Sequence, residues 1–117
     1  MYVTHAPTAD TSAVYGPGAE GVSIQWLIDE SRGAPSFAMR RFVIEPGGHT
    51  PFHRHDWEHE VYVLGGCGSL VSAEGETALT PGSAVFVAPN EDHQFRAAAA
   101  DSLELLCMVP NGPATVH

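Results

Sequence analysis

The chain has 117 residues, which is enough for one domain with a single core. Fourteen acidic residues stand against five arginines, and the formal net charge of -9 disfavours nucleic acid and anionic membranes as partners. The first residues carry neither a basic start nor an apolar run, and no stretch could cross a bilayer. We therefore expect a cytoplasmic protein whose two cysteines, Cys67 and Cys107, are reduced thiols.

Short apolar or alternating runs, separated by glycine and proline, follow one another along the chain. This pattern is typical of a β-sandwich or barrel and predicts an all-β fold in a single domain. The expected strands, in chain order, are 22–28, 37–45, 49–55, 59–64, 68–73, 76–80, 83–88, 93–97 and 102–109. Turns are expected between them, including 46–48, 81–82 and 89–90.

The two ends of the chain differ from the middle in composition. Residues 1–20 are rich in alanine, threonine, glycine and proline, and we expect a loose N-terminal arm that could become ordered against a partner subunit. Residues 111–117 have the same character and are expected to form a C-terminal tail. The folded β-barrel is then expected to cover residues 21–110.

Four histidines are candidate metal ligands. His53, His55 and His59 lie in one short run, and His93 follows a hairpin later. Side chains alternate along a strand, so His53 and His55 share a face, and a three-residue corner lets His59 turn back toward them. Because neutral imidazole is the commonest protein ligand for transition metals, the run predicts a metal centre. The alternative is a set of solvent-facing strand histidines.

The third ligand position is ambiguous. His59 and Glu60 are adjacent on a strand and must face opposite sides. With His59 inward, Val61 and Val63 also point inward. With Glu60 inward, Tyr62 and Leu64 would point inward instead. Both sets suit a barrel interior, so alternation leaves the choice open.

The same alternation suggests a pocket wall. Arg40 and Arg41 cannot both face inward, and we place Arg40 in the interior, where it would orient an anionic or carbonyl substrate. A surface ion pair is the alternative for this arginine, and plain barrel core is the alternative for its apolar companions. The candidates for the wall of a small-molecule pocket are Arg40, Phe42, Phe95, Leu105 and Cys107.

Two stretches of the chain resemble a known family. Gly47 is followed after five residues by His53, His55 and then Glu60, and the run 81–93 carries a proline, a glycine and a terminal histidine. These stretches resemble the two sequence motifs of the cupins, small double-stranded β-helix (jelly-roll) barrels. The resemblance covers residues 35–110 and implies a cupin-type barrel that pairs as a homodimer, which would also protect its edge strands.

Three shorter runs, 57–64, 89–93 and 105–110, resemble the small four-histidine manganese cupins. This resemblance favours His59 over Glu60 and implies one divalent transition metal per chain. Manganese is the first expectation, with iron, nickel, cobalt, copper or zinc as alternatives. The ligands that it implies are His53, His55, His59 and His93.

Three functions remain open at this point. Four neutral imidazoles would leave a divalent ion its full charge and hold it in the reduced state, while an octahedral ion would keep two open positions. We therefore expect an oxidoreductase of the dioxygenase type that activates O2 or peroxide. The first alternative is a non-redox isomerase, cyclase or lyase with the metal as Lewis acid. The second is a ligand-binding cupin without turnover.

Overall fold

The computed structural model describes residues 1–111; part of the expected C-terminal tail, residues 112–117, lies outside the described residues. Almost all of the regular structure is β-strand, with two single-turn 3₁₀ helices, η1 (Ala6–Thr8) and η2 (Glu30–Arg32). The strands are β1 (Ser12–Ala13), β2 (Glu20–Ile28), β3 (Phe37–His49), β4 (His59–Gly66), β5 (Gly68–Ser72), β6 (Gly75–Leu79), β7 (Ala84–Val87), β8 (His93–Ala97) and β9 (Leu103–Pro110).

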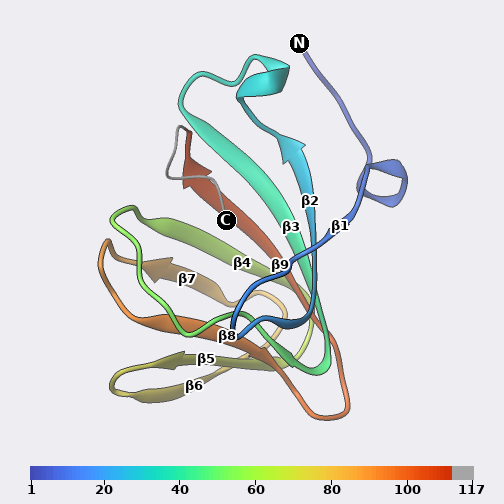
Figure 1. Ribbon diagram of the computed structural model, residues 1–117. Coiled ribbons are helices and arrows are strands. Elements are labelled where there is room, and N and C mark those ends of the chain that lie inside the picture. Colours follow the sequence, from blue (N-terminus) through green and yellow to red (C-terminus); the bar gives the residue numbers. More distant parts are fainter. Residues whose placement is uncertain (112–117) are drawn as a thin grey trace.

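The strands form one antiparallel sheet in the order β6-β5-β8-β3-β9-β4-β7. β2 pairs with the edge of β3 opposite β9, from Met39 to His49, and β1 pairs with β2. The sheet curls into a half-open barrel, with β5 and β6 at one end of the curl and β2 and β3 at the other (Figure 1). The expectation of an all-β, single-domain fold is confirmed.

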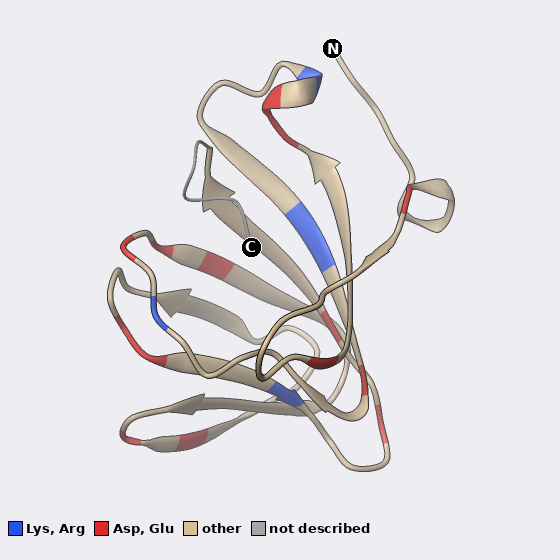
Figure 2. Cartoon of the chain, viewed as in Figure 1, with Lys and Arg blue, Asp and Glu red and all other residues tan. Residues whose placement is uncertain are grey.

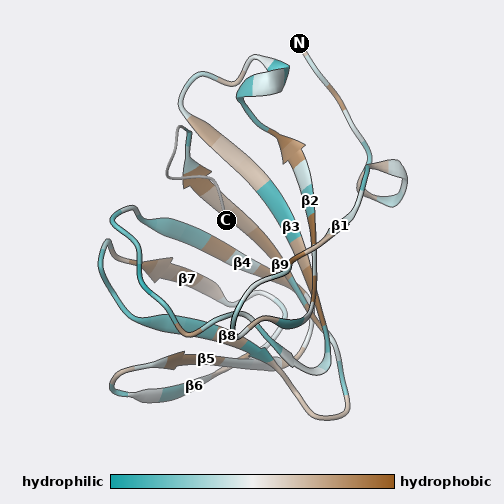
Figure 3. Ribbon diagram, viewed as in Figure 1, coloured by the Kyte–Doolittle hydropathy of each residue, from teal (hydrophilic) through white to brown (hydrophobic). Residues whose placement is uncertain are grey.

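Alternating side chains on two long neighbouring strands build the interior. Buried and more exposed residues alternate along β4 from His59 to Leu64 and along β9 from Leu103 to Pro110. Hydrophobic residues recur along β2, β3 and β9 (Figure 3). The buried apolar cluster consists of Val22, Ala38, Ile44, Val61, Val63, Leu79, Val87, Phe95, Ala97, Leu103, Leu105, Cys107 and Val109. Removal of this surface from water is the main stabilising term of the fold.

The expected strand 49–55 is wrong. β3 ends at His49, and residues 50–58 form a loop that contacts β8 through hydrogen bonds between Thr50 and Phe95 and through an isolated bridge between His53 and His93. Pro51 lacks the backbone N–H that a ladder needs, which explains why the pairing stops there. The first two histidines of the cluster therefore come from a loop, although their alternation suggested a strand.

The expected turn 46–48 lies inside β3. Gly47 has a positive φ of 76°, and a Cβ on Gly48 would come within 2.5 Å of the carbonyl oxygen of Glu20. The pairing of β2 with β3 shifts register at this bend, since Glu20 pairs with His49. The glycines thus bend the strand without ending it, and they direct the following loop toward β8.

The N-terminal arm is anchored on the sheet. The side-chain amide of Gln25 on β2 donates to the carbonyls of Ala6 and Ala9 at 2.6 and 3.2 Å, and Val14 N–H donates to Val22 at 2.9 Å. β1 crosses in front of β2 and β3 in Figure 1. The arm is therefore less loose than its composition suggested, and its contact with a partner subunit stays a prediction.

Acidic side chains are spread over loops and strand ends, while the few basic ones are scattered (Figure 2). Among the described residues, no helix has the length and hydrophobicity required to cross a membrane.

Candidate metal centre

Four histidine rings converge at one side of the barrel interior. Ring nitrogens of His53, His55 and His93 all lie within 4.8 Å of one another. His59 joins them through Nε2, which lies 2.6 Å from Nε2 of His55. The structure thus brings together all four histidines that the sequence singled out. Three of them form a group positioned to bind a metal ion, with the fourth beside it.

The histidines come from three places in the chain that the sheet brings together. His93 is the first residue of β8, and its backbone exchanges hydrogen bonds of 2.9 and 3.1 Å with the backbone of His53 in the loop. His59 is the first residue of β4, where it pairs with Val87 of β7. His53 and His55 are half-buried, whereas His59 and His93 are buried.

Trp57 fixes the corner between the loop and β4. Its ring stacks on His55 with centroids 4.1 Å apart and an angle of 9° between the planes. His55 stacks in turn on His59 at 4.4 Å. The stack limits the rotation of His55.

Backbone carbonyls orient two of the rings. Nδ1 of His55 lies 3.0 Å from the carbonyl oxygen of Trp57, and Nδ1 of His93 lies 2.8 Å from that of Glu91. A carbonyl oxygen only accepts, so each Nδ1 carries the proton and donates. Each Nε2 is then left with its lone pair, which is the arrangement found when histidine binds a metal.

Three of the four rings have a lowered pKa, which favours their neutral form at neutral pH. Burial lowers the pKa of His55 to about 4, against the opposing effect of the hydrogen bond to Trp57. Burial also lowers the pKa of His53 and of His93. A neutral ring is the form that binds a metal ion, so these three histidines need not lose a proton first.

The orientation that the sequence left open is settled by β4. His59 is buried, while Glu60 points outward and is exposed. A hydrogen bond with Glu58 raises the pKa of Glu60 on that outer face. Glu60 therefore lies on the face opposite the histidine group.

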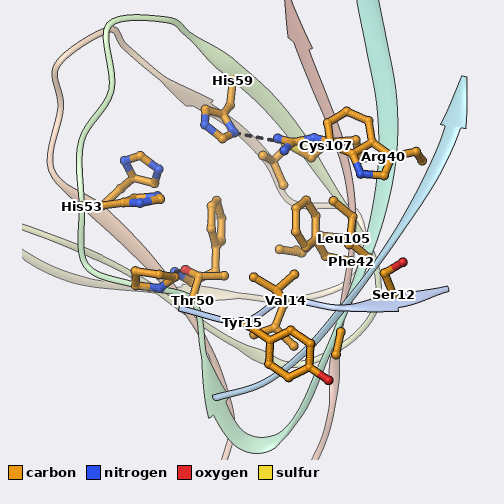
Figure 4. Close-up of a pocket in the computed structure, with 18 residues that line it drawn as sticks. Ser12, Val14, Tyr15, Arg40, Phe42, Thr50, His53, His59, Leu105 and Cys107 are labelled. Atoms are coloured by element: carbon orange, nitrogen blue, oxygen red, sulfur yellow. Dashed lines mark hydrogen bonds between the residues drawn. The ribbon is translucent and has the colours of Figure 1, made fainter. Parts of the chain in front are cut away.

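A cavity of about 480 Å³ lies beside the histidines. Figure 4 shows His53 and His59 on one side, Arg40 and Cys107 on another, and Val14 and Tyr15 along the edge. The five pocket candidates from the sequence all line it. The lining residues are Ser12, Ala13, Val14, Tyr15, Val22, Ile24, Trp26, Arg40, Phe42, Thr50, Pro51, His53, His59, Val61, His93, Phe95, Leu105 and Cys107. None of these described lining residues is acidic, and most are apolar.

Arg40 faces inward, as expected, and is fully buried. Its Nη2 donates to Cys107 Sγ at 3.1 Å, and the same sulfur lies 3.1 Å from Nδ1 of His59. Burial raises the pKa of the Cys107 thiol, with Arg40 opposing the effect. Arg41, on the other face of β3, instead forms an ion pair with Glu104 at 2.9 Å.

Sequence reasoning missed the contribution of the N-terminal arm. The arm segment 12–15 and Trp26 of β2 line the cavity, and so do Thr50 and Pro51. The arm carries no periodic pattern that would have placed it there. Trp26 lies on β2 opposite Arg40, and this register was not visible before the strands were paired.

The donor set fits a divalent transition metal. The four side chains supply nitrogen donors, the ring orientation leaves Nε2 of His55 and His93 with lone pairs, and burial favours the neutral form of His53, His55 and His93. Nitrogen-only donors suit manganese, iron, cobalt, nickel, copper or zinc better than calcium or magnesium. This chemistry does not identify the metal.

Comparisons with known proteins identify a family and similar solved structures. The cupin domain family model matches residues 40–109. The structure of the polyketide cyclase RemF from Streptomyces resistomycificus is similar with a TM-score of 0.90 and 34% identity, over 94% of this chain and 79% of that one. A cupin-2 domain protein from Rhodospirillum rubrum gives a TM-score of 0.83 and 30% identity, over 95% and 75% of the two chains.

A curated relative matches over part of its length. The 1-methylthio-D-xylulose 5-phosphate methylsulfurylase of Rhodospirillum rubrum is 38% identical over 71 residues, which is 61% of this chain. The match covers 46% of that relative, so this chain spans about half of its length.

Proposed function

Since this chain belongs to the cupin family, we propose that it is a metal-dependent enzyme that isomerises, cyclises or cleaves an apolar carbonyl compound without net oxidation. The cupin-type barrel expected from the two histidine motifs is confirmed by the same match. Membership of the four-histidine manganese subgroup, with His53, His55, His59 and His93 as ligands, is part of the proposal.

One observation carries it. Three of the four histidines, His53, His59 and His93, line a largely apolar cavity whose described lining residues include no carboxylate, and His55 lies next to His59. A divalent ion bound there would supply Lewis acidity toward a carbonyl or enolate oxygen of the substrate. Because imidazole binds a metal ion in its uncharged form, no ligand would cancel the charge that this chemistry uses.

The residues around the histidines support the same chemistry. Phe42, Phe95 and Leu105 give the cavity an apolar wall that displaces water from a bound substrate. In a water-poor site, charges act on a substrate oxygen more strongly than they do in solution. The cavity volume of about 480 Å³ accommodates a small molecule.

The similar proteins favour cyclisation among these reactions. The solved structure with 34% identity over 94% of this chain is named a polyketide cyclase. Cyclisation of such a carbonyl chain joins carbon atoms through an enolate and consumes no oxidant. An apolar cavity next to a Lewis acid would hold the carbonyl chain and stabilise the enolate.

Oxygen activation is the second candidate. Four uncharged nitrogen donors favour the reduced state of a transition metal, which is the state that reacts with O2 or peroxide. The donor set therefore remains compatible with a dioxygenase-type oxidoreductase. The non-oxidative reaction and the dioxygenase-type reaction at this site differ in whether they require O2 or peroxide.

Anaerobic assays of the manganese-loaded protein test the proposal. Apolar compounds with several carbonyl groups would be incubated with the protein in the presence and absence of O2, and products identified by mass spectrometry. We expect products of unchanged mass, of water loss or of cleavage, none of them carrying oxygen from O2, at equal rates in both atmospheres, and no product with the His93→Ala variant. Turnover only with O2, with oxygen atoms incorporated, would replace the proposal with the second candidate.

A further inference from the structure

Arg40, a buried cation in the cavity wall, has no anionic partner among the described residues. Arg40 has 0% exposure, and its register neighbours in the sheet are Trp26 on β2 and Cys107 on β9. Its guanidinium lies 5.3 Å from the ring centroid of Trp26 and 5.0 Å from that of Phe42. The two rings hold the guanidinium plane in place at the cavity wall.

The hydrogen bonds of this arginine are incomplete. Nη2 donates to Cys107 Sγ, while Nε and Nη1 have no partner among the described residues. Each of the two N–H forks of a guanidinium contains one of these partnerless nitrogens. A buried charge without a counter-charge costs free energy, which an incoming anion would recover.

We propose that Arg40 binds the carboxylate of a substrate that is otherwise apolar. A guanidinium fork matches the two oxygens of a carboxylate, and burial strengthens such a pair. A phosphate would carry about two negative charges, whereas Arg40 is the only Arg or Lys among the described lining residues. The remaining wall is mainly aliphatic and aromatic and fits a hydrocarbon body.

The position of Arg40 relative to the histidines narrows the substrate class. A single sulfur atom, Cys107 Sγ, lies within 3.1 Å of both Arg40 Nη2 and His59 Nδ1. A carboxylate on Arg40 would therefore hold the adjoining part of the substrate near the histidine group. The substrate of the proposed enzyme is then an apolar keto or enol acid, an assignment that rests on the proposed function, whereas carboxylate binding itself does not.

The Trp26 ring lies over the guanidinium, so a carboxylate that binds Arg40 is expected to displace it. Arg40 is fully buried, and the Trp26 ring that lies over it is partly exposed. A carboxylate reaches the guanidinium when this ring moves toward solvent. Tryptophan fluorescence is therefore expected to change on binding, and the change should disappear in a Trp26→Phe variant that keeps Trp57.

Three probes of equal chain length test the assignment without turnover. Octanoate, octanamide and octyl phosphate would be titrated into the protein as purified, with binding followed by calorimetry and metal content measured in each sample. We expect octanoate to bind about 10- to 100-fold more tightly than octanamide, as for a charge-assisted pair, and more tightly than octyl phosphate. In Arg40→Met this preference for the acid should be lost, while octanamide affinity and metal content stay unchanged.

Arg41→Gln is the matched control, because Arg41 lies next to Arg40 but faces outward, and it should keep the full preference. Equal binding of octanoate and octanamide by the unchanged protein would overturn the proposal and needs no variant. A preference that survives in Arg40→Met would also overturn it, because the acid would then bind elsewhere, such as at the metal. A protein that lacks metal but prefers octanoate through Arg40 would support this inference while contradicting the proposed function.

Discussion

The two ring nitrogens of His55 and of His93 have different roles. In His55 and His93, Nδ1 donates to a backbone carbonyl, and this leaves Nε2 as the donor toward an ion. The carbonyls belong to Trp57 and Glu91, two residues away from each histidine in the chain. Short local hydrogen bonds therefore set the tautomer of both rings. Metal-binding histidines are oriented by such hydrogen bonds to their second ring nitrogen.

Removal of one imidazole is expected to abolish metal binding. His93→Ala should lower metal affinity by at least about 100-fold, since loss of an outer partner alone costs about 10- to 100-fold. Elemental analysis after dialysis against a weak chelator measures the effect. His5→Ala is the control, because His5 is exposed and outside the group, and it should keep the metal. Full metal content in His93→Ala would show that the ion binds elsewhere.

The two cysteines should differ in reactivity. Cys107 is 3% exposed and burial raises its pKa, while Cys67 is partly exposed. A thiol reagent should modify one sulfur quickly in the native protein and the second only after unfolding. Cys67→Ser should remove the fast phase. Rapid labelling of Cys107 in that variant would mean that the cavity wall opens readily.

At the scale of elements, the loops at the rim position the histidines through hydrogen bonds, as the strands do. The loop before β8 contains Asn90, whose φ is +64° and whose N–H donates to the carbonyl of His55 at 2.6 Å. The same loop supplies the Glu91 carbonyl that orients His93. Its backbone conformation therefore bears directly on the site.

Substitutions at Asn90 should follow backbone preference. Asn90→Ala is expected to destabilise the fold by about 1 kcal/mol, because alanine adopts positive φ at a cost, while Asn90→Gly should be close to neutral. Thermal denaturation of the three proteins gives the comparison. Equal destabilisation by alanine and glycine would indicate that the asparagine side chain, rather than its backbone, matters.

Strands were predicted well where the alternation of side chains was strong. β4 and β9 alternate between buried and less buried residues and were found within two residues of their bounds. Residues 49–55 also contain alternating histidines, but Pro51 and the bend at Gly47 end the pairing. Side-chain alternation shows which face a residue occupies only where the backbone is paired in a sheet. The sequence alone did not show that pairing ends within residues 49–55.

The histidine group was foreseeable because its members cluster in two short runs. The rest of the cavity was not, since the arm segment 12–15 is distant in sequence and has no pattern of its own. Likewise Arg40 could be placed inward by alternation with Arg41, but its lack of an anionic partner within residues 1–111 depends on every strand that surrounds it. Such contacts follow from the complete fold and not from any one segment.

For the whole molecule, one exposed apolar face lies at an edge of the sheet. β7 is the last strand of the order, and its Phe86 is 61% exposed. Phe86 pairs with Glu60 on β4, and Tyr62 and Leu64, which follow on the same face of β4, are also exposed. Exposed edges and apolar patches favour association. We therefore propose that the chain forms a homodimer through this face.

Light scattering after size exclusion measures the mass directly. The unchanged chain should elute as a dimer at micromolar concentration, and Phe86→Glu should shift it toward monomer. Phe37→Glu is the control, because Phe37 is equally exposed but begins β3, away from this face, and it should remain dimeric. A monomeric unchanged chain would contradict the proposal, and a dimeric Phe86→Glu would place the interface elsewhere.

The convergence of four imidazoles on one ion is the claim on which the enzyme proposal depends. Crystals of the protein purified with manganese, measured at a wavelength where manganese scatters anomalously, test it most directly. We expect one strong anomalous peak per chain, about 2.0–2.3 Å from a ring nitrogen of each of His53, His55, His59 and His93. A cavity without a peak, or a peak that His59 does not reach, would contradict the account.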